Sequence, residues 1–327
     1  MKISILIPFY NASLFIERTL LSALNQSYSN IDYVLVNDGS VDDSMLKINN
    51  IINNHPRKKS VVLKEHDNNY GVSIARNTCI NNATGDYIYF LDSDDELPID
   101  AIKNLVDCNI GSFADLILGE FNVTGGKRDN FKEIKFENEI RGNKKILDSF
   151  LTQKWYDGTC NKLVKKKFLS ENNITFQENI VHEDVLWSFE IAMKAELMIY
   201  CKKITYIYHL RPDSITQKMA DKNFNSLIFI MNKLVEYDNI FKIHQNNKQI
   251  FNYFANVRIY FLKKLILTTT NKSKIKEMIK KINYIFSSKK YNKLSNYSIP
   301  SLFKLLPYKV PTSFAIFYLK LILCLKK

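Results

Sequence analysis

Three carboxylates stand within four residues of one another: Asp92, Asp94 and Asp95 come directly after the apolar residues 87–91. Carboxylates this close repel one another unless a cation or several hydrogen bonds compensate their charge. Oxygen ligands of this kind suit Mg²⁺ or Mn²⁺, which can also bridge a diphosphate. A helix start is the alternative, because acidic side chains interact favourably with the helix dipole there. The cluster by itself leaves both interpretations open.

Three more polar positions are candidates for a site. Asp38 lies in the cluster Asn37-Asp38-Gly39-Ser40, and Arg76 lies early in a predicted helix. Glu183 and Asp184 begin another predicted helix. Adjacent side chains on a helix point about 100° apart, so only one of these two carboxylates can face a reaction centre. Each cluster, taken alone, is also explained as a turn or a helix start.

Strands and helices of an α/β sheet are predicted to position these residues. The apolar runs are typical of buried parallel strands, and they are residues 3–7, 31–36, 61–64 and 87–91. Residues 16–24 and 72–83 have helical spacing, with Asn11 as the expected N-cap of the first helix. Alternating strands and helices build a doubly wound sheet that binds ligands at the carboxyl ends of its strands. We therefore expect loops 8–11, 37–43 and 92–96 at one edge.

The motifs in this order resemble those of the family-2 glycosyltransferases of the GT-A fold. They are Ile7-Pro8-Phe9-Tyr10-Asn11, Asn37-Asp38-Gly39-Ser40, Gly71-Val72-Ser73-Ile74-Ala75-Arg76-Asn77 and Leu91-Asp92-Ser93-Asp94-Asp95. The resemblance is close over about the first 100 residues and looser to about residue 217. It implies a Rossmann-like, mostly parallel sheet, Mn²⁺ or Mg²⁺ as cofactor, and inverting transfer from a nucleotide-sugar, usually a UDP-sugar. The acceptor would be a hydroxyl of a glycan or lipid-linked oligosaccharide, as in lipopolysaccharide or capsule synthesis.

The resemblance also implies roles for single residues on the donor side. Those roles place Pro8 and Tyr10 along the uridine, Asp38 at the uracil imide, Arg76 near the base or the phosphates, and Asp92 at the ribose or a metal-bound water. Arg211 and Ser214, in a late loop, would contact the diphosphate. Asp94 would be the direct metal ligand. His209 would ligate the metal or contact phosphate, unless it is an ordinary surface histidine.

On the acceptor side the resemblance implies a catalytic base. Val181-His182-Glu183-Asp184 is similar to the family's Glu-Asp motif, so Asp184 is expected to deprotonate the acceptor hydroxyl. Glu183 would hold the backbone or the acceptor. Trp155 would stack on a sugar of the acceptor, although a large aromatic side chain is more often part of the core.

Composition excludes several classes of protein. No Gly-x-Gly occurs in the 327 residues, which argues against a nicotinamide enzyme, and no P-loop is present. The five cysteines are far apart, so we expect no zinc site or disulfide framework, and a reducing cytoplasm. We expect no secretory signal.

A sugar nucleotidyltransferase is the enzymatic alternative to a glycosyltransferase, and it would release pyrophosphate instead of UDP.

The positive charge is concentrated in the last third of the chain. Residues 1–110 have a net charge of −5 and residues 111–217 of +1, whereas residues 218–327 carry 21 basic and 4 acidic side chains. We therefore predict a catalytic domain over 1–217 and a basic helical region over 218–327. Residues 310–325 are apolar but shorter than the roughly 20 residues of a membrane span.

We expect this basic region to hold the enzyme on the inner face of the cell membrane as a peripheral protein. Alternatively, the basic region could pack against a second subunit in a homodimer. Nucleic-acid binding by the basic segment is the non-enzymatic alternative, but its aromatic residues lie on helical stripes, which favours a core.

Overall fold

The computed structural model describes residues 1–126, 137–210 and 221–324, and the chain divides into two compact units. The first unit comprises Met1–Phe150, Lys154–Asn179 and Glu183–Ser214. The second comprises Leu151–Gln153, Ile180–His182 and Ile215–Lys327. The domain boundary predicted after residue 217 lies outside the described residues.

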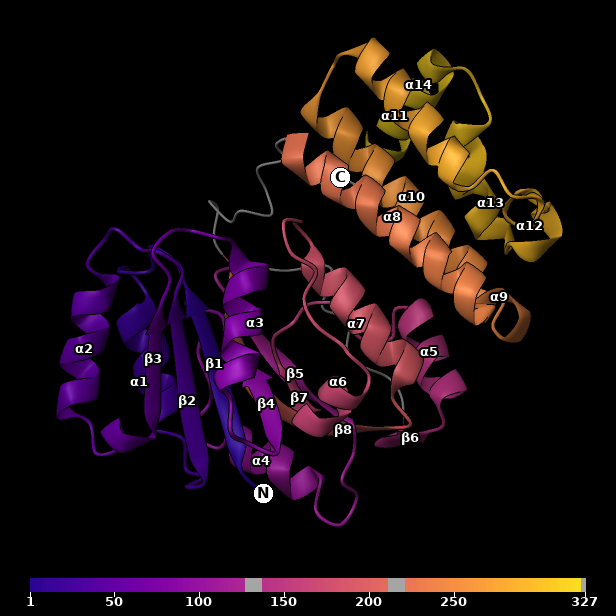
Figure 1. The fold of residues 1–327 in the computed structure, drawn as a ribbon. Coiled ribbons are helices and arrows are strands. Elements are labelled where there is room, and N and C mark those ends of the chain that lie inside the picture. The colour runs from indigo at the N-terminus through magenta and orange to yellow at the C-terminus, as the bar shows by residue number, and fades with distance from the viewer. Residues whose placement is uncertain (127–136, 211–220, 325–327) are drawn as a thin grey trace. The chain divides into compact units, whose positions relative to one another are not determined.

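An eight-stranded mixed sheet forms the centre of the first unit (Figure 1). Its strands are β1 (Ile3–Phe9), β2 (Ile31–Asn37), β3 (Val61–Glu65), β4 (Tyr87–Phe90), β5 (Leu116–Thr124), β6 (Glu139–Arg141), β7 (Lys162–Lys165) and β8 (Leu197–His209). Their order is β3-β2-β1-β4-β7-β5-β8-β6. The first four strands are mutually parallel, β5 pairs in parallel with β8, and the other neighbours are antiparallel. The predicted α/β fold with a mostly parallel, doubly wound sheet is confirmed.

Helices cover both faces of this sheet. They are α1 (Ile16–Leu24), α2 (Ser44–Asn54), α3 (Val72–Asn82), α4 (Ala101–Cys108), α5 (Asn143–Leu151), α6 (Lys166–Glu171) and α7 (Glu183–Lys194), with a 3₁₀ turn at Lys58–Ser60. Because side chains alternate along a strand, Ile5 and Tyr33 pack with α1, α2 and α4 in one buried cluster. On the other face, Cys79 of α3 contacts the Val34 carbonyl, and Trp187 of α7 packs edge-on against Phe90.

The carboxyl ends of β1 and β2 are tied together directly. The Asp38 amide donates to the Phe9 carbonyl at 2.9 Å. Gly39 has φ +73°, and a Cβ there would lie 2.5 Å from the Asn68 backbone, so only glycine fits this turn. The prediction that Asn11 caps α1 is wrong, because that helix begins at Ile16 and its N-cap residue is Phe15. The Asn11 side chain instead accepts from the Val41 amide at 2.9 Å, which joins the loop after β1 to the loop after β2.

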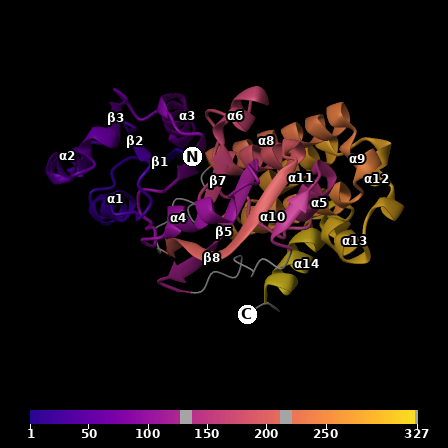
Figure 2. The same ribbon diagram turned by 90° about the horizontal axis from the view of Figure 1, so that it is seen from below.

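The second unit consists of helices in the described residues, coloured orange to yellow in Figure 2. They are α8 (Asp221–Phe241), α9 (Ile243–Asn246), α10 (Gln249–Thr268), α11 (Lys272–Ile285), α12 (Lys289–Asn292), α13 (Ile299–Leu305) and α14 (Thr312–Cys324), with 3₁₀ turns at Leu294–Asn296 and Leu306–Tyr308. The predicted helical region is confirmed: Met231 and Leu234 on α8 and Phe254 and Phe261 on α10 are fully buried. Over the described ranges no helix has both the length and the apolar character that a membrane span requires.

A buried carboxylate joins three helices of this second unit. Asp238 of α8 accepts hydrogen bonds from the Tyr291 hydroxyl at 2.5 Å, from Lys290 Nζ at 2.9 Å and from the His244 amide at 2.7 Å. Burial alone would raise the pKa of Asp238, but these donors hold the pKa below its ordinary value. The charged network therefore stabilises the packing of α8 on α9 and α12.

Candidate active site

The loop after β2 is organised around Asp38, which is almost completely buried. Its oxygens accept from the Tyr70 amide at 3.1 Å and the Gly71 amide at 2.8 Å, and His66 Nδ1 lies 2.8 Å from Oδ1. The carboxylate thus holds the segment that leads into α3, and its bond to a uracil stays a prediction. Tyr10 and Tyr70, each 46% exposed, are the accessible aromatic rings beside it, while Pro8 is buried.

Arg76 of α3 connects two carboxylates from distant parts of the chain. Its guanidinium is buried, forms an ion pair with Glu183 of α7, and lies 3.3 Å from Asp92 after β4. Burial alone would lower the pKa of Arg76, but the carboxylates of Glu183, Asp92 and Asp184 raise it, so the guanidinium remains charged. The structure therefore places Arg76 between the predicted donor side and the predicted base.

Glu183 and Asp184 occupy the first turn of α7 and differ in their surroundings. Glu183 is buried against Arg76, whereas Asp184 is partly exposed. Burial, and then the charges of Glu183 and Asp157, raise the pKa of Asp184 well above the ordinary carboxylate range. A carboxylate with a raised pKa is a stronger base once it is ionised, which suits the predicted role of Asp184 in proton removal.

The three carboxylates after β4 also separate into distinct environments. Asp95 is buried and accepts from the Tyr206 hydroxyl at 2.9 Å and the His209 amide at 2.8 Å. Burial, and then the charge of Asp92, raises its pKa to about 7. Asp92 and Asp94 are partly exposed, so they are the two whose oxygens can face a ligand. Asp95 instead anchors the turn to β8.

The predicted metal site is only partly supported by the surrounding groups. Both ring nitrogens of His209 have partners, because Nδ1 lies 2.7 Å from Thr124 Oγ1 and Nε2 lies 2.6 Å from Glu96 Oε1. Metal binding by His209, which stays a prediction, would require one of these two contacts to be exchanged. Among the described residues, no group of three or more His, Cys, Asp and Glu side chains gathers to hold a metal. Two partly exposed carboxylates, Asp92 and Asp94, still fit a divalent cation whose remaining ligands come from phosphate and water.

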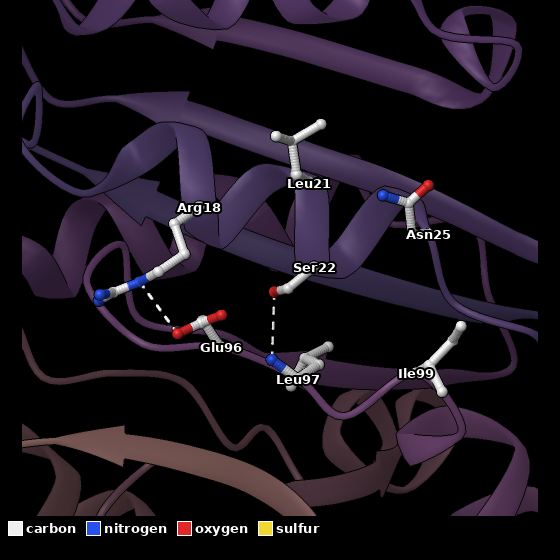
Figure 3. A pocket seen from close by; sticks show the side chains of 7 residues that line it. All are labelled: Arg18, Leu21, Ser22, Asn25, Glu96, Leu97 and Ile99. Atoms are coloured by element: carbon white, nitrogen blue, oxygen red, sulfur yellow. Dashed lines mark hydrogen bonds and ion pairs between the residues drawn. The ribbon is translucent and has the colours of Figure 1, made fainter. Parts of the chain in front are cut away.

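A surface pocket adjoins the chain just after this turn (Figure 3). It is lined by Arg18, Leu21, Ser22, Asn25, Glu96, Leu97 and Ile99. Arg18 Nε pairs with Glu96 at 3.0 Å, and the Leu97 amide donates to Ser22 Oγ at 3.1 Å. Since Glu96 also contacts His209, these contacts hold the chain after Asp95 against α1, and the pocket contains none of the predicted site residues.

The segment before β7 contributes a buried lysine instead of an exposed tryptophan. Trp155 is 4% exposed, and its indole donates to Ser149 Oγ at 2.9 Å, so we leave it out of the proposed acceptor site. Lys162 is fully buried, with Nζ 3.9 Å from the centre of the Tyr156 ring. Burial lowers the pKa of Lys162 to about 8, an effect opposed by Asp157 and Asp184. Arg211 and Ser214 lie outside the described residues.

Sequence reasoning missed two residues of this region, His66 and Lys162. His66 directly follows β3, so the rule that placed the other loops at the carboxyl edge of the sheet would also have indicated it. Lys162 had no such signal, because a lysine at the start of a short strand is ordinarily exposed.

Glu183→Gln is expected to destabilise the first unit by roughly 3 kcal/mol, because it leaves the buried Arg76 guanidinium with only one carboxylate contact. Urea denaturation followed by circular dichroism measures this change. Glu171→Gln is the matched control, since Glu171 pairs with Lys167 on the surface of the same unit and its loss should cost less than about 1 kcal/mol. Equal stability of the two variants would contradict the proposed importance of the ion pair.

Comparison with known proteins gives matches in both sequence and fold. Residues 4–172 match the family described as "Glycosyl transferase family 2". The chain is 27% identical over 248 residues to Glycosyltransferase GlyA of Streptococcus pneumoniae, covering 72% of this chain and 34% of that protein. It is 31% identical over 213 residues to the poly(ribitol-phosphate) beta-N-acetylglucosaminyltransferase TarP of Staphylococcus aureus, covering 64% and 62%. The chain thus spans about a third to two thirds of the length of these relatives.

The crystal structure of S. aureus TarS residues 1–349 in complex with UDP-GlcNAc has the same fold. It superposes with a TM-score of 0.62 over 90% of this chain and 92% of that chain, at 17% sequence identity.

Proposed function

The chain belongs to glycosyl transferase family 2, and from that membership we propose that it transfers a sugar from a UDP-sugar to a hydroxyl group of an acceptor, with inversion at the anomeric carbon. The observation that carries this proposal is the connection of Asp92 through Arg76 to Glu183, the neighbour of Asp184. It links the loop after β4, with its two partly exposed carboxylates, to the helix turn that carries Asp184, whose raised pKa suits proton removal.

In the proposed reaction Asp184 removes the proton from the acceptor hydroxyl while the hydroxyl oxygen attacks the anomeric carbon of the donor sugar. The bond to UDP breaks on the opposite face, so an α-linked donor gives a β-linked product. Arg76 holds Glu183, and thereby the first turn of α7, in position for this step. Asp94, with Asp92, would hold Mn²⁺ or Mg²⁺, which when bound stabilises negative charge on the departing diphosphate.

We propose a glycan or a polyol-phosphate polymer as the acceptor. The name of the S. aureus relative TarP, a poly(ribitol-phosphate) transferase that is 31% identical over 213 residues, supports an acceptor of this class. A lipid-linked acceptor at the inner face of the cell membrane, with lipopolysaccharide or capsule as the product, remains our proposal from the sequence. In that case the enzyme would work as a peripheral membrane protein, attached through its basic second unit.

A screen of nucleotide-sugars by thermal shift, with and without Mn²⁺, tests the donor. At a ligand concentration 100 times the dissociation constant, binding adds about 2.7 kcal/mol to the free energy of unfolding, so a cognate UDP-sugar should raise the melting temperature measurably. GDP- and dTDP-sugars are the comparison ligands, and ADP is the negative control. Release of pyrophosphate from UTP and a sugar phosphate, without transfer from any nucleotide-sugar, would establish a nucleotidyltransferase and overturn the proposal.

A further inference from the structure

Helices α13 and α14 expose large apolar side chains that the second unit does not bury. They are Ile299 and Phe303 on α13, and Phe314, Phe317 and Leu321 on α14. Phe303 is 61% and Phe317 is 64% exposed. Residues 299 and 303 are four positions apart, and residues 314, 317 and 321 are three and four apart, so each set shares one face of its helix. We call these five side chains the α13–α14 surface.

The two helices that carry this surface touch each other. The Tyr318 hydroxyl of α14 donates to the Phe303 carbonyl of α13 at 3.3 Å, and both helices pack against the 3₁₀ turn at Leu306–Tyr308 that lies between them in the chain. Ala315 and Leu319 are fully buried on another face of α14. Helix α14 therefore has apolar side chains both where it packs on the protein and on its exposed side, where Ser313 and Lys320 also lie. Large apolar side chains on two faces of a helix are typical of a helix that is covered on both.

The charge around the α13–α14 surface indicates what covers it. After Glu277 the sequence contains ten lysines and no acidic residue. Lys309 precedes α14 and is exposed, and Lys320 is exposed between Phe317 and Leu321. A lysine in this position can lie along apolar surface with its ammonium among headgroups. Apolar side chains surrounded by lysines are the composition of a segment that lies in the interface of an anionic membrane.

From this we propose that the α13–α14 surface inserts into the headgroup region of an anionic lipid bilayer. A second copy of the chain fits less well, because Lys309 and Lys320 beside this surface would approach the same two lysines of the other copy and repel them. Nucleic acid could stack bases on the three phenylalanines of this surface, but Ile299 and Leu321 are aliphatic and offer no ring, so it fits less well than lipid. This inference deepens the proposed function by naming the residues that contact the membrane. It rests on the proposed function for the reason why the enzyme binds a membrane, and the binding itself can be tested without the transfer reaction.

Flotation of the full-length protein with vesicles tests the insertion without donor or acceptor, so its result does not depend on the transfer reaction. We expect the protein to float with vesicles of phosphatidylglycerol and phosphatidylcholine, and not with phosphatidylcholine alone. In the variant Phe303→Ser/Phe317→Ser, binding to the anionic vesicles should fall at least about tenfold, because two aromatic side chains are lost from the apolar interface. Lys309→Glu/Lys320→Glu should weaken binding as well, and raised salt should reproduce that loss.

Tyr284→Ser/Leu267→Ser is the matched control, because it removes two exposed apolar side chains from α11 and α10 of the same unit. The control variant should float like the unaltered protein, and circular dichroism should show that both variants fold. Equal loss of flotation in the two variants, or no flotation of the unaltered protein, would overturn the proposal. A dimer in size-exclusion chromatography that Phe303→Ser/Phe317→Ser abolishes would overturn it in favour of a second copy.

Discussion

Asp184→Asn is expected to lower kcat by roughly 10²–10⁴-fold and to leave the dissociation constant for UDP nearly unchanged, because the change removes a positioned base without altering its size. Steady-state release of UDP gives kcat, and calorimetry gives the UDP affinity. The comparison variant is Glu183→Gln, in which the neighbouring carboxylate loses its charge but Asp184 stays. If Glu183→Gln, tested at a temperature where it is folded, were inactive while Asp184→Asn kept near-normal turnover, the two carboxylates would have to exchange roles.

The pH dependence gives this assignment a second, independent measurement. A base acts only when it is ionised, and burial with the charges of Glu183 and Asp157 raises the pKa of Asp184. We therefore expect kcat/KM to rise with pH well above the range in which an ordinary carboxyl group ionises. Asp157→Asn removes one of the two negative charges, so it should lower this pKa and move the rising limb toward acid pH. An unchanged profile in Asp157→Asn would mean that another group limits the reaction.

Asp94→Ala is expected to lower transfer by at least about 10³-fold, because a bound divalent cation supplies several kcal/mol of charge stabilisation to the leaving diphosphate. Asp94 is a partly exposed carboxylate of the turn after β4. Calorimetry should show that Mn²⁺ tightens UDP binding to the unaltered protein and no longer does so in the variant.

Asp100→Ala is the control for Asp94→Ala, because Asp100 is an exposed carboxylate of the same connection between β4 and α4. Its side chain contacts only Ser27 among the hydrogen bonds found in the described structure, so turnover should stay near normal. Full activity in the presence of EDTA, or a Mn²⁺ effect that survives Asp94→Ala, would contradict the metal site.

The sequence alone predicted the first four strands and the edge of the sheet at which the motifs lie. Apolar runs at 3–7, 31–36, 61–64 and 87–91 became β1 to β4, because a strand buried on both faces requires a continuous apolar segment. Parallel strands joined by helices place their carboxyl ends together, so the loops that carry Asp38 and Asp92 could be predicted as neighbours. These are local and topological rules, and the order of residues contains the information they need.

The partners of each polar side chain, in contrast, were decided by the tertiary structure. Arg76 pairs with Glu183 across 107 positions of sequence, and Asp95 receives the His209 amide across 114. Both ring nitrogens of His209 have partners, Thr124 and Glu96, and Trp155 is buried. A buried polar group must find partners in whatever surrounds it, and those surroundings exist only after distant segments pack. The motifs therefore predicted the region of the site, while packing decided which carboxylates are engaged by other side chains and which can face a ligand.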